Sequence, residues 1–99
     1  MNEFKTFVGI DISKKTFDAG VLKLNHPGSI THKCFSQTRE GYKSFVNWLA
    51  DQQIIIDQDV LMCMEHTGMY INSMVNFLVG IDANIWVEMP LRIKKSLGL

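Results

Sequence analysis

The stretch Lys5-Thr-Phe-Val-Gly-Ile-Asp-Ile-Ser-Lys-Lys-Thr-Phe-Asp18 decides the fold that we predict for this chain. An apolar run, 7–10, ends at Asp11, and a second strand-like segment begins at Thr16 after a short polar turn. Apolar and β-branched residues over this length favour a buried strand over a helix. A carboxylate at the end of such a strand must be paired, bind a cation or stay protonated. Asp11 is therefore the first candidate for a functional residue.

Composition limits what the chain can be. Its 99 residues are enough for one domain with a core of its own, and a hydrophobic fraction of 46% is that of a globular protein. Ten basic and ten acidic residues give a formal net charge of zero. This balance excludes the broad attraction to phosphate that a strongly basic domain has. Contacts with a nucleic acid would therefore have to be local.

Cysteine usage and the N-terminus predict a cytoplasmic protein. Cys34 and Cys63 lack metal-ligand spacing, and we expect two buried free thiols in a reducing compartment. The N-terminus, with Asn2, Glu3 and Lys5 before a short apolar run, is not a signal peptide. Because no apolar stretch approaches the roughly 20 residues that span a bilayer, no membrane association is expected.

The first half of the chain predicts three strands, over 4–12, 16–24 and 29–36. The link at 13–15 is short enough for an antiparallel hairpin, and the Asn-His-Pro-Gly sequence at 25–28 is a second turn signal. Three strands joined in this way form a meander.

The hydrophobic period then changes from that of a strand to that of a helix. Thr38 is the expected N-cap, and Glu40 is favourably placed in the first turn. The buried face of this helix is predicted to carry Tyr42, Phe45, Val46 and Leu49.

Further along, a buried strand over 60–64 ends at Glu65. A second helix follows, with Thr67 as the expected N-cap and Gly80 at its C-terminal cap. A fifth strand is expected over 83–87, and a third helix from Pro90. The buried stripe of the second helix is predicted to be Ile71, Met74, Val75 and Leu78.

The order β-β-β-α-β-α-β-α predicts an α/β fold whose mixed sheet is flanked by helices. Right-handed crossovers place the fourth strand beside the first and the fifth outside it, which gives the strand order 3-2-1-4-5. Asp11 and Glu65 then end adjacent parallel strands, at the edge where ligands of such sheets gather.

Two carboxylates brought together repel each other unless a cation lies between them. Mg²⁺ or Mn²⁺ is the natural choice, because hard cations prefer carboxylate oxygens. Two such ions about 4 Å apart would activate the attacking oxygen and stabilise the leaving oxygen in phosphoryl transfer.

Three segments of the chain resemble one family. They are Val8-Gly-Ile-Asp-Ile-Ser-Lys14, Met64-Glu-His-Thr-Gly-Met-Tyr70, and Pro90 with the cations that follow it. In this order and spacing they resemble the N-terminal catalytic domain of the DEDD transposases related to the Piv invertases. That resemblance implies a ribonuclease-H-like fold close to the RuvC resolvases.

The resemblance assigns catalytic, metal-binding roles to Asp11 and Glu65, as the first two acids of a quartet. The family's other two acids lie in an Asp-x-x-Asp segment, but no acid follows Glu88 in this sequence. The family's C-terminal domain, which carries a nucleophilic serine, has no counterpart either. We therefore expect 1–99 to be a single domain, C-terminally truncated, with weak Mg²⁺ or Mn²⁺ binding and little activity of its own.

The resemblance further implies an insertion-sequence transposase, or site-specific recombinase, that cleaves and rejoins DNA strands. A structured guide RNA is an additional partner in many members. Exposed edges of an incomplete sheet also favour a homo-oligomer.

Other residues are interpreted with a structural alternative beside each. Candidate nucleic-acid contacts are Lys14 in the first turn and the cluster Arg92, Lys94 and Lys95; each could instead be solvated surface. We place Asp18 outside the site, because alternation along its strand is expected to point it away from, or to the side of, Asp11. Trp48 and Trp86 are expected to pack.

Two alternative functions stay open on the sequence. An actin-like ATPase or sugar kinase shares this sheet topology, but the turn 12–15 lacks the glycines that wrap phosphate in that class. A non-catalytic remnant that dimerises or binds nucleic acid is the other. Metal binding by Asp11 and Glu65 would favour the transposase, and nucleotide binding the kinase class.

Overall fold

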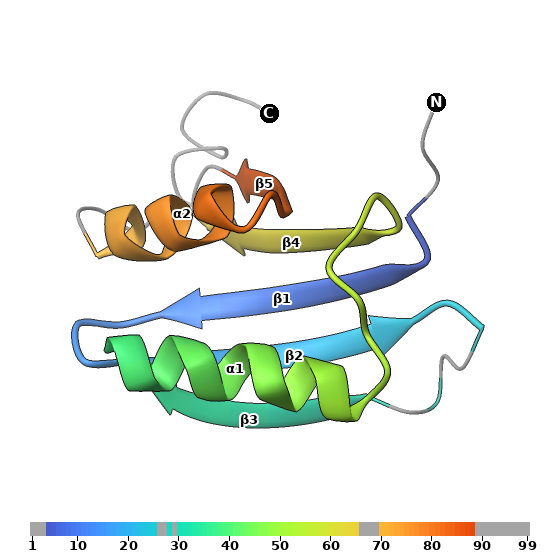
Figure 1. Ribbon diagram of the computed structural model, residues 1–99, viewed down its shortest axis with the longest axis horizontal. Helices are drawn as coiled ribbons and strands as arrows, with labels where there is room; N and C mark the ends of the chain where they lie inside the picture. The colour runs from blue at the N-terminus through green and yellow to red at the C-terminus, as the bar shows by residue number, and fades with distance from the viewer. Residues whose placement is uncertain (1–3, 26–27, 29, 66–69, 89–99) are drawn as a thin grey trace, which may run out of the picture.

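The computed structural model describes residues 4–25, 28, 30–65 and 70–88. The elements run β1 (Thr6–Ile12), β2 (Thr16–Lys23), β3 (Thr31–Ser36), α1 (Arg39–Asp51), β4 (Val60–Glu65), α2 (Ile71–Gly80) and β5 (Asn84–Glu88) (Figure 1). The five strands form one sheet in the order β3-β2-β1-β4-β5.

This topology confirms the predicted fold class and strand order. β1 pairs antiparallel with β2 and parallel with β4, while β2–β3 is antiparallel and β4–β5 parallel. The predicted strands differ from the observed ones by one or two residues at their ends. The helix expected from Pro90 and the N-cap expected at Thr67 lie outside the described residues.

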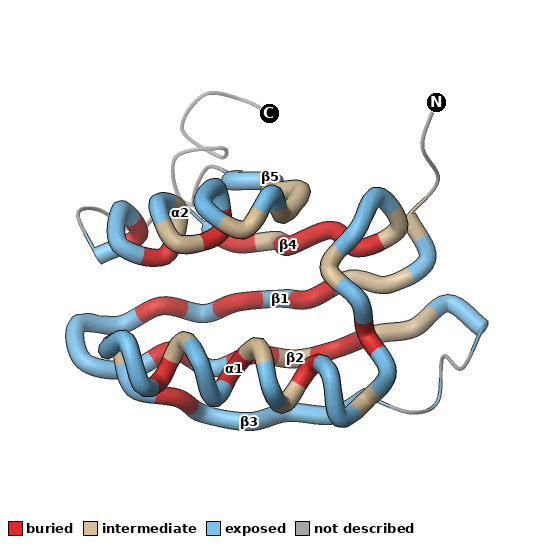
Figure 2. The backbone as a smooth tube through the Cα atoms, viewed as in Figure 1, coloured by how far each residue is buried: buried red, intermediate tan, exposed pale blue. Residues whose placement is uncertain are grey.

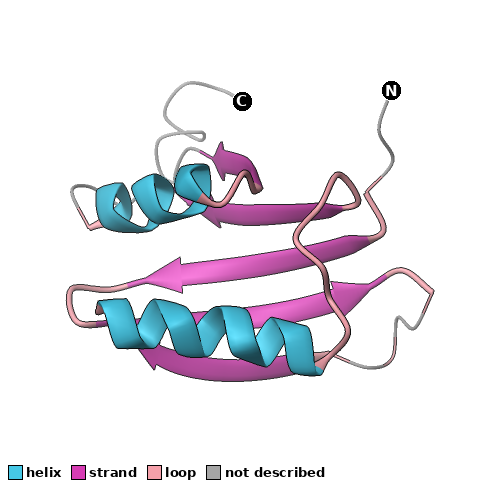
Figure 3. Ribbon diagram, viewed as in Figure 1, coloured by secondary structure: helices cyan, strands magenta, loops and turns pink. Residues whose placement is uncertain are grey.

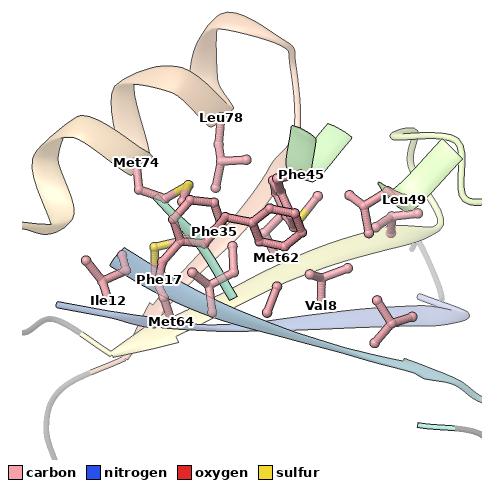
Figure 4. Close-up of a cluster of buried hydrophobic side chains, with 14 of the residues drawn as sticks. Val8, Ile12, Phe17, Phe35, Phe45, Leu49, Met62, Met64, Met74 and Leu78 are labelled. Carbon is pink, nitrogen blue, oxygen red and sulfur yellow. The ribbon is translucent and has the colours of Figure 1, made fainter. Parts of the chain in front are cut away.

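Both helices lie on the same face of the sheet (Figures 1 and 3). The strands alternate, so that every second residue is buried beneath the helices; Val8, Ile10 and Ile12 of β1 are examples. Figure 4 shows Phe17, Phe35 and Phe45 clustered in this core, and the ring centroids of Phe17 and Phe45 are 5.4 Å apart. Among the described residues, no helix covers the opposite face of the sheet. We call that face the open face.

The start of α1 follows the prediction. The Thr38 side chain accepts a hydrogen bond from the Gly41 backbone N–H at 3.0 Å, and Glu40 lies in the first turn. Gly41 is required for packing, because a Cβ there would overlap the carbonyl oxygen of Ser36 at the end of β3. Of the predicted face, Phe45 and Leu49 are fully buried.

The end of α2 corrects the prediction for Gly80. Gly80 is the last helical residue, and the chain turns two residues later, where Asp82 adopts a φ of 58°. The backbone N–H of Ala83 donates to the Leu78 carbonyl at 3.0 Å and closes the helix. Aspartate tolerates this left-handed conformation better than most residues, so the glycine was not needed there.

No helix in the described part of the chain is long and apolar enough to cross a membrane.

Candidate metal edge and its surroundings

Asp11 and Glu65 lie at neighbouring strand ends, as predicted. The parallel register pairs Ile10 of β1 with Met64 of β4, so the next residue on each strand is an acid. Adjacent strands are about 4.8 Å apart. Two carboxylates that start from this separation are within reach of one cation.

Both acids belong to the open face. Ile10 and Met64 are buried under the helices, and side chains alternate along a strand, so Asp11 and Glu65 point the other way. Both are exposed. In Figure 1 the arrowheads of β1 and β4 lie at the same end of the sheet as the first turns of α1 and α2. We call this end the carboxyl edge.

Asp18 lies on the open face too, contrary to the prediction. The antiparallel register pairs Asp11 directly with Asp18. Residues paired across an antiparallel ladder point to the same face, so the two carboxylates are neighbours. The turn fixes this register, because the Ser13 N–H donates to the Thr16 carbonyl at 2.9 Å. The residue numbers of every β1–β2 pair have the same sum as those of Ser13 and Thr16. Pairing the residues outward from a Ser13–Thr16 turn places Asp18 opposite Asp11, so the sequence could have predicted that the two acids are neighbours.

Glu88 extends the acids to a fourth strand. It pairs with Glu65 in the parallel register of β4 and β5 and is exposed. Four neighbouring strands therefore place one row of carboxylates along this edge of the sheet, in the order Asp18, Asp11, Glu65, Glu88. We call this set the acid row. Like charges on paired positions destabilise a sheet, which favours a cation at this edge.

An open hollow of about 790 Å³ extends from the acid row across the open face. Its floor includes the paired glycines Gly9 and Gly20, and a Cβ on Gly9 would meet nothing within 4 Å. Trp86 also lines it, with 55% of its surface exposed. Trp86 is therefore not packed into the core that the described residues form, contrary to the expectation. Trp48 packs against this core as predicted.

The cysteines correct another prediction. Cys34 is exposed on the edge strand β3, and Cys63 is half-buried on the open face; both are free. Neither is the fully buried thiol that was expected, because both lie opposite the helices. Burial, and secondarily the negative charge of Glu88, raise the pKa of the Cys63 thiol.

The donor set at the carboxyl edge suits a hard cation but is incomplete among the described residues. Carboxylate oxygens are the ligands that Mg²⁺ and Mn²⁺ prefer. No group of three or more His, Cys, Asp or Glu side chains in the described ranges is arranged to hold a metal ion. What the structure brings together is a pair, Asp11 and Glu65, with one further acid beside each.

The candidate nucleic-acid contacts are only partly placed. Lys14 is exposed in the β1–β2 turn, three residues after Asp11. The predicted cluster Arg92, Lys94 and Lys95 lies outside the described residues.

Sequence reasoning missed Gln37, which joins the elements around the carboxyl edge. Its side-chain amide donates to the backbone carbonyls of Ser13 (3.2 Å) and Tyr70 (3.4 Å). Its side-chain oxygen accepts from the Tyr42 hydroxyl at 2.9 Å, and its backbone N–H donates to the Lys15 carbonyl at 2.8 Å. No pattern in the sequence marks a lone glutamine between a strand and a helix for such a role.

Comparison with known proteins identifies the family. A family model for DEDD transposases of the IS110 group, described as a transposase, matches residues 8–97. The chain belongs to this transposase family. The match includes Asp11, Asp18, Glu65 and Glu88, and it favours the transposase reading over the ATPase or sugar-kinase alternative.

Solved structures agree with the fold. The Thermus thermophilus RuvC structure superimposes with a TM-score of 0.56 at 11% identity, covering 94% of this chain and 67% of RuvC. YeaZ from Pseudomonas aeruginosa superimposes with a TM-score of 0.57 at 10% identity, covering 96% of this chain and 50% of YeaZ. The chain thus spans about two thirds of the one and half of the other, and at these identities the likeness shows a RuvC-like fold alone. No curated protein matches the chain.

Proposed function

We propose that this transposase domain contributes Asp11 and Glu65 to a divalent-metal site that cleaves and rejoins DNA strands. The observation that carries the proposal is the adjacency of these two acids at the ends of paired parallel strands, on an exposed edge. Family membership supports DNA as the substrate. A structured guide RNA and self-association belong to the same proposal for the parent protein.

The chain's own residues would bind and position the reacting groups. Mg²⁺ or Mn²⁺, when bound, would supply charge to activate an attacking oxygen and to stabilise a leaving oxygen. Asp11 lies between Asp18 and Glu65 in the acid row, so its carboxylate would hold the metal together with a neighbouring acid. Glu65, at the end of β4, would supply the second carboxylate. The rigid sheet fixes both backbones, which leaves only side-chain rotation to adjust the geometry.

We further propose that the 99-residue chain alone binds metal weakly and cleaves little. Two carboxylates fill a small part of the six oxygen positions that an octahedral ion requires. The other two acids of the family's quartet have no counterpart after Glu88 in this sequence. The single-domain, truncated organisation expected from the sequence remains part of this proposal.

Calorimetric titration with Mn²⁺ tests the metal site. We expect weak binding to the wild-type chain and its loss in both Asp11→Asn and Glu65→Gln. Asp51→Asn, at the end of α1, removes one exposed carboxylate away from the acid row and should bind as wild type does.

Binding that survives both substitutions would contradict a shared site at these acids. It would favour the non-catalytic reading, in which the chain only associates or binds nucleic acid. Tight binding of a nucleotide without any Mn²⁺ binding would instead revive the ATPase alternative.

A further inference from the structure

A second surface lies at the carboxyl edge, on the helix side of the sheet. Two hollows, of about 410 and 360 Å³, adjoin each other there and share Gln37 and Ser73. We call the two together the helix groove. It lies between the N-terminal half of α1, one side of α2 and the β1–β2 turn, whereas the acid row lies on the open face.

The charge of the helix groove is opposite to that of the acid row. Lys14 lines one hollow, and Arg39 and Lys43 line the other; all three are exposed. No Asp or Glu among the described residues lines either hollow. At this edge, the three cations that line the helix groove therefore lie on the helix side of the sheet, and the acid row lies on the open face.

The polar lining fits a phosphodiester backbone. Asn72, Ser73 and Asn76 of α2 line the hollow beside Lys14, and such side chains are common donors to phosphate oxygens. The N-cap of α2, Tyr70, supplies no side-chain hydrogen bond, and the positive end of the helix dipole lies at this hollow.

The groove is also held in place. Gln37 lines both hollows and bonds to the turn, to Tyr42 of α1 and to Tyr70 before α2. Tyr42 packs against Phe77 of α2 with ring centroids 4.8 Å apart. A surface fixed by three elements loses little conformational entropy when it binds a ligand.

From these observations we infer that the helix groove binds the sugar-phosphate backbone of a nucleic-acid strand that passes over the carboxyl edge. The nature of the occupant rests on the proposed function, whereas the groove's affinity for phosphate does not require metal. Lys14 and Lys43 neutralise phosphates, one in each hollow, and the α2 amides and hydroxyl set the path between them.

The test is fluorescence anisotropy with labelled single strands of about 12 nucleotides, one of DNA and one of RNA with the same sequence, in EDTA. Lys14→Gln/Lys43→Gln removes one groove cation from each hollow. Lys5→Gln/Lys33→Gln is the matched control, because it removes the same charge from two exposed lysines outside the groove.

We expect the groove variant to bind roughly tenfold more weakly than wild type, with the control close to wild type. Two lost phosphate contacts should also reduce the slope of log K against log salt by about 1.4. Preference for the DNA or the RNA strand identifies the occupant; equal binding means recognition of the shared backbone alone.

The inference is overturned if the groove variant binds as tightly as the control, or if wild type binds neither strand at millimolar protein. Circular dichroism of both variants verifies that they are folded. Because EDTA is present throughout, a failure of the metal site leaves these results unchanged, and a failure of the groove leaves the Mn²⁺ titration unchanged.

Discussion

At the scale of single residues, Asp18 shows most clearly which structural properties can be predicted from the sequence. Its identity and strand were predicted, but its face was not, because the face depends on the register set by the Ser13–Thr16 turn. A shift of one residue in the pairing register moves every side chain of the strand to the opposite face of the sheet. Asp11 and Glu65 were correctly predicted to lie near the ends of adjacent strands, because each follows an apolar run in the sequence.

Replacing Asp18 should stabilise the metal-free protein. Asp18→Asn removes one of two like charges on paired positions, and we expect a gain of about 0.2–1 kcal/mol in the free energy of unfolding by urea in EDTA. Asp11→Asn should give a gain of the same sign. In a double-mutant cycle the gain of the double variant should be smaller than the sum, because both substitutions relieve one repulsion. A loss of stability in Asp18→Asn would show that its carboxylate has a favourable partner.

The two cysteines should differ in reactivity. The thiolate is the nucleophile, and the raised pKa of Cys63 leaves less thiolate at neutral pH. We therefore expect an alkylating reagent at pH 7.5 to modify the exposed Cys34 faster than the half-buried Cys63, as measured by mass spectrometry of the digested chain. Glu88→Gln should speed the reaction of Cys63 by removing the secondary cause of the shift. Equal rates at the two cysteines would contradict this account of their environments.

At the scale of elements, local signals predicted what local interactions determine. The period of Phe45 and Leu49 indicated that α1 is a helix, and the N-cap at Thr38 located its start. The hydrogen bonds of Gln37 could not be predicted from the sequence, because they join three elements that are distant in sequence. The exposure of β3 was also missed, since a strand's position at the edge of a sheet follows from the tertiary arrangement (Figure 2).

The cap of α1 offers a direct measurement at this scale. Thr38→Ala removes the acceptor for the Gly41 N–H and should lower the free energy of unfolding by about 1 kcal/mol. Ser44→Ala, at an exposed position within α1, is the control and should change stability by a few tenths of a kcal/mol at most. If both substitutions had the same effect, the cap would contribute nothing measurable.

At the scale of the whole molecule, the fold turns a balanced composition into two charged surfaces. The three cations of the helix groove lie on one side of the carboxyl edge and the acid row on the other. Topology explains this, because parallel strands end where the following helices begin. Net charge alone excluded a broad attraction to phosphate, and only the arrangement in space indicates where a local contact with a strand could form.

The most direct test of the central claim locates the metal by NMR. Mn²⁺ added to the isotope-labelled chain should broaden the amide signals of residues 10–12 and 64–65 first, because these flank Asp11 and Glu65 on adjacent strands. The same titration of Asp11→Asn should leave those signals sharp. Broadening that instead centres on Asp57 and Asp59, at the opposite end of β4, or that persists in the variant, would contradict a metal site at the carboxyl edge.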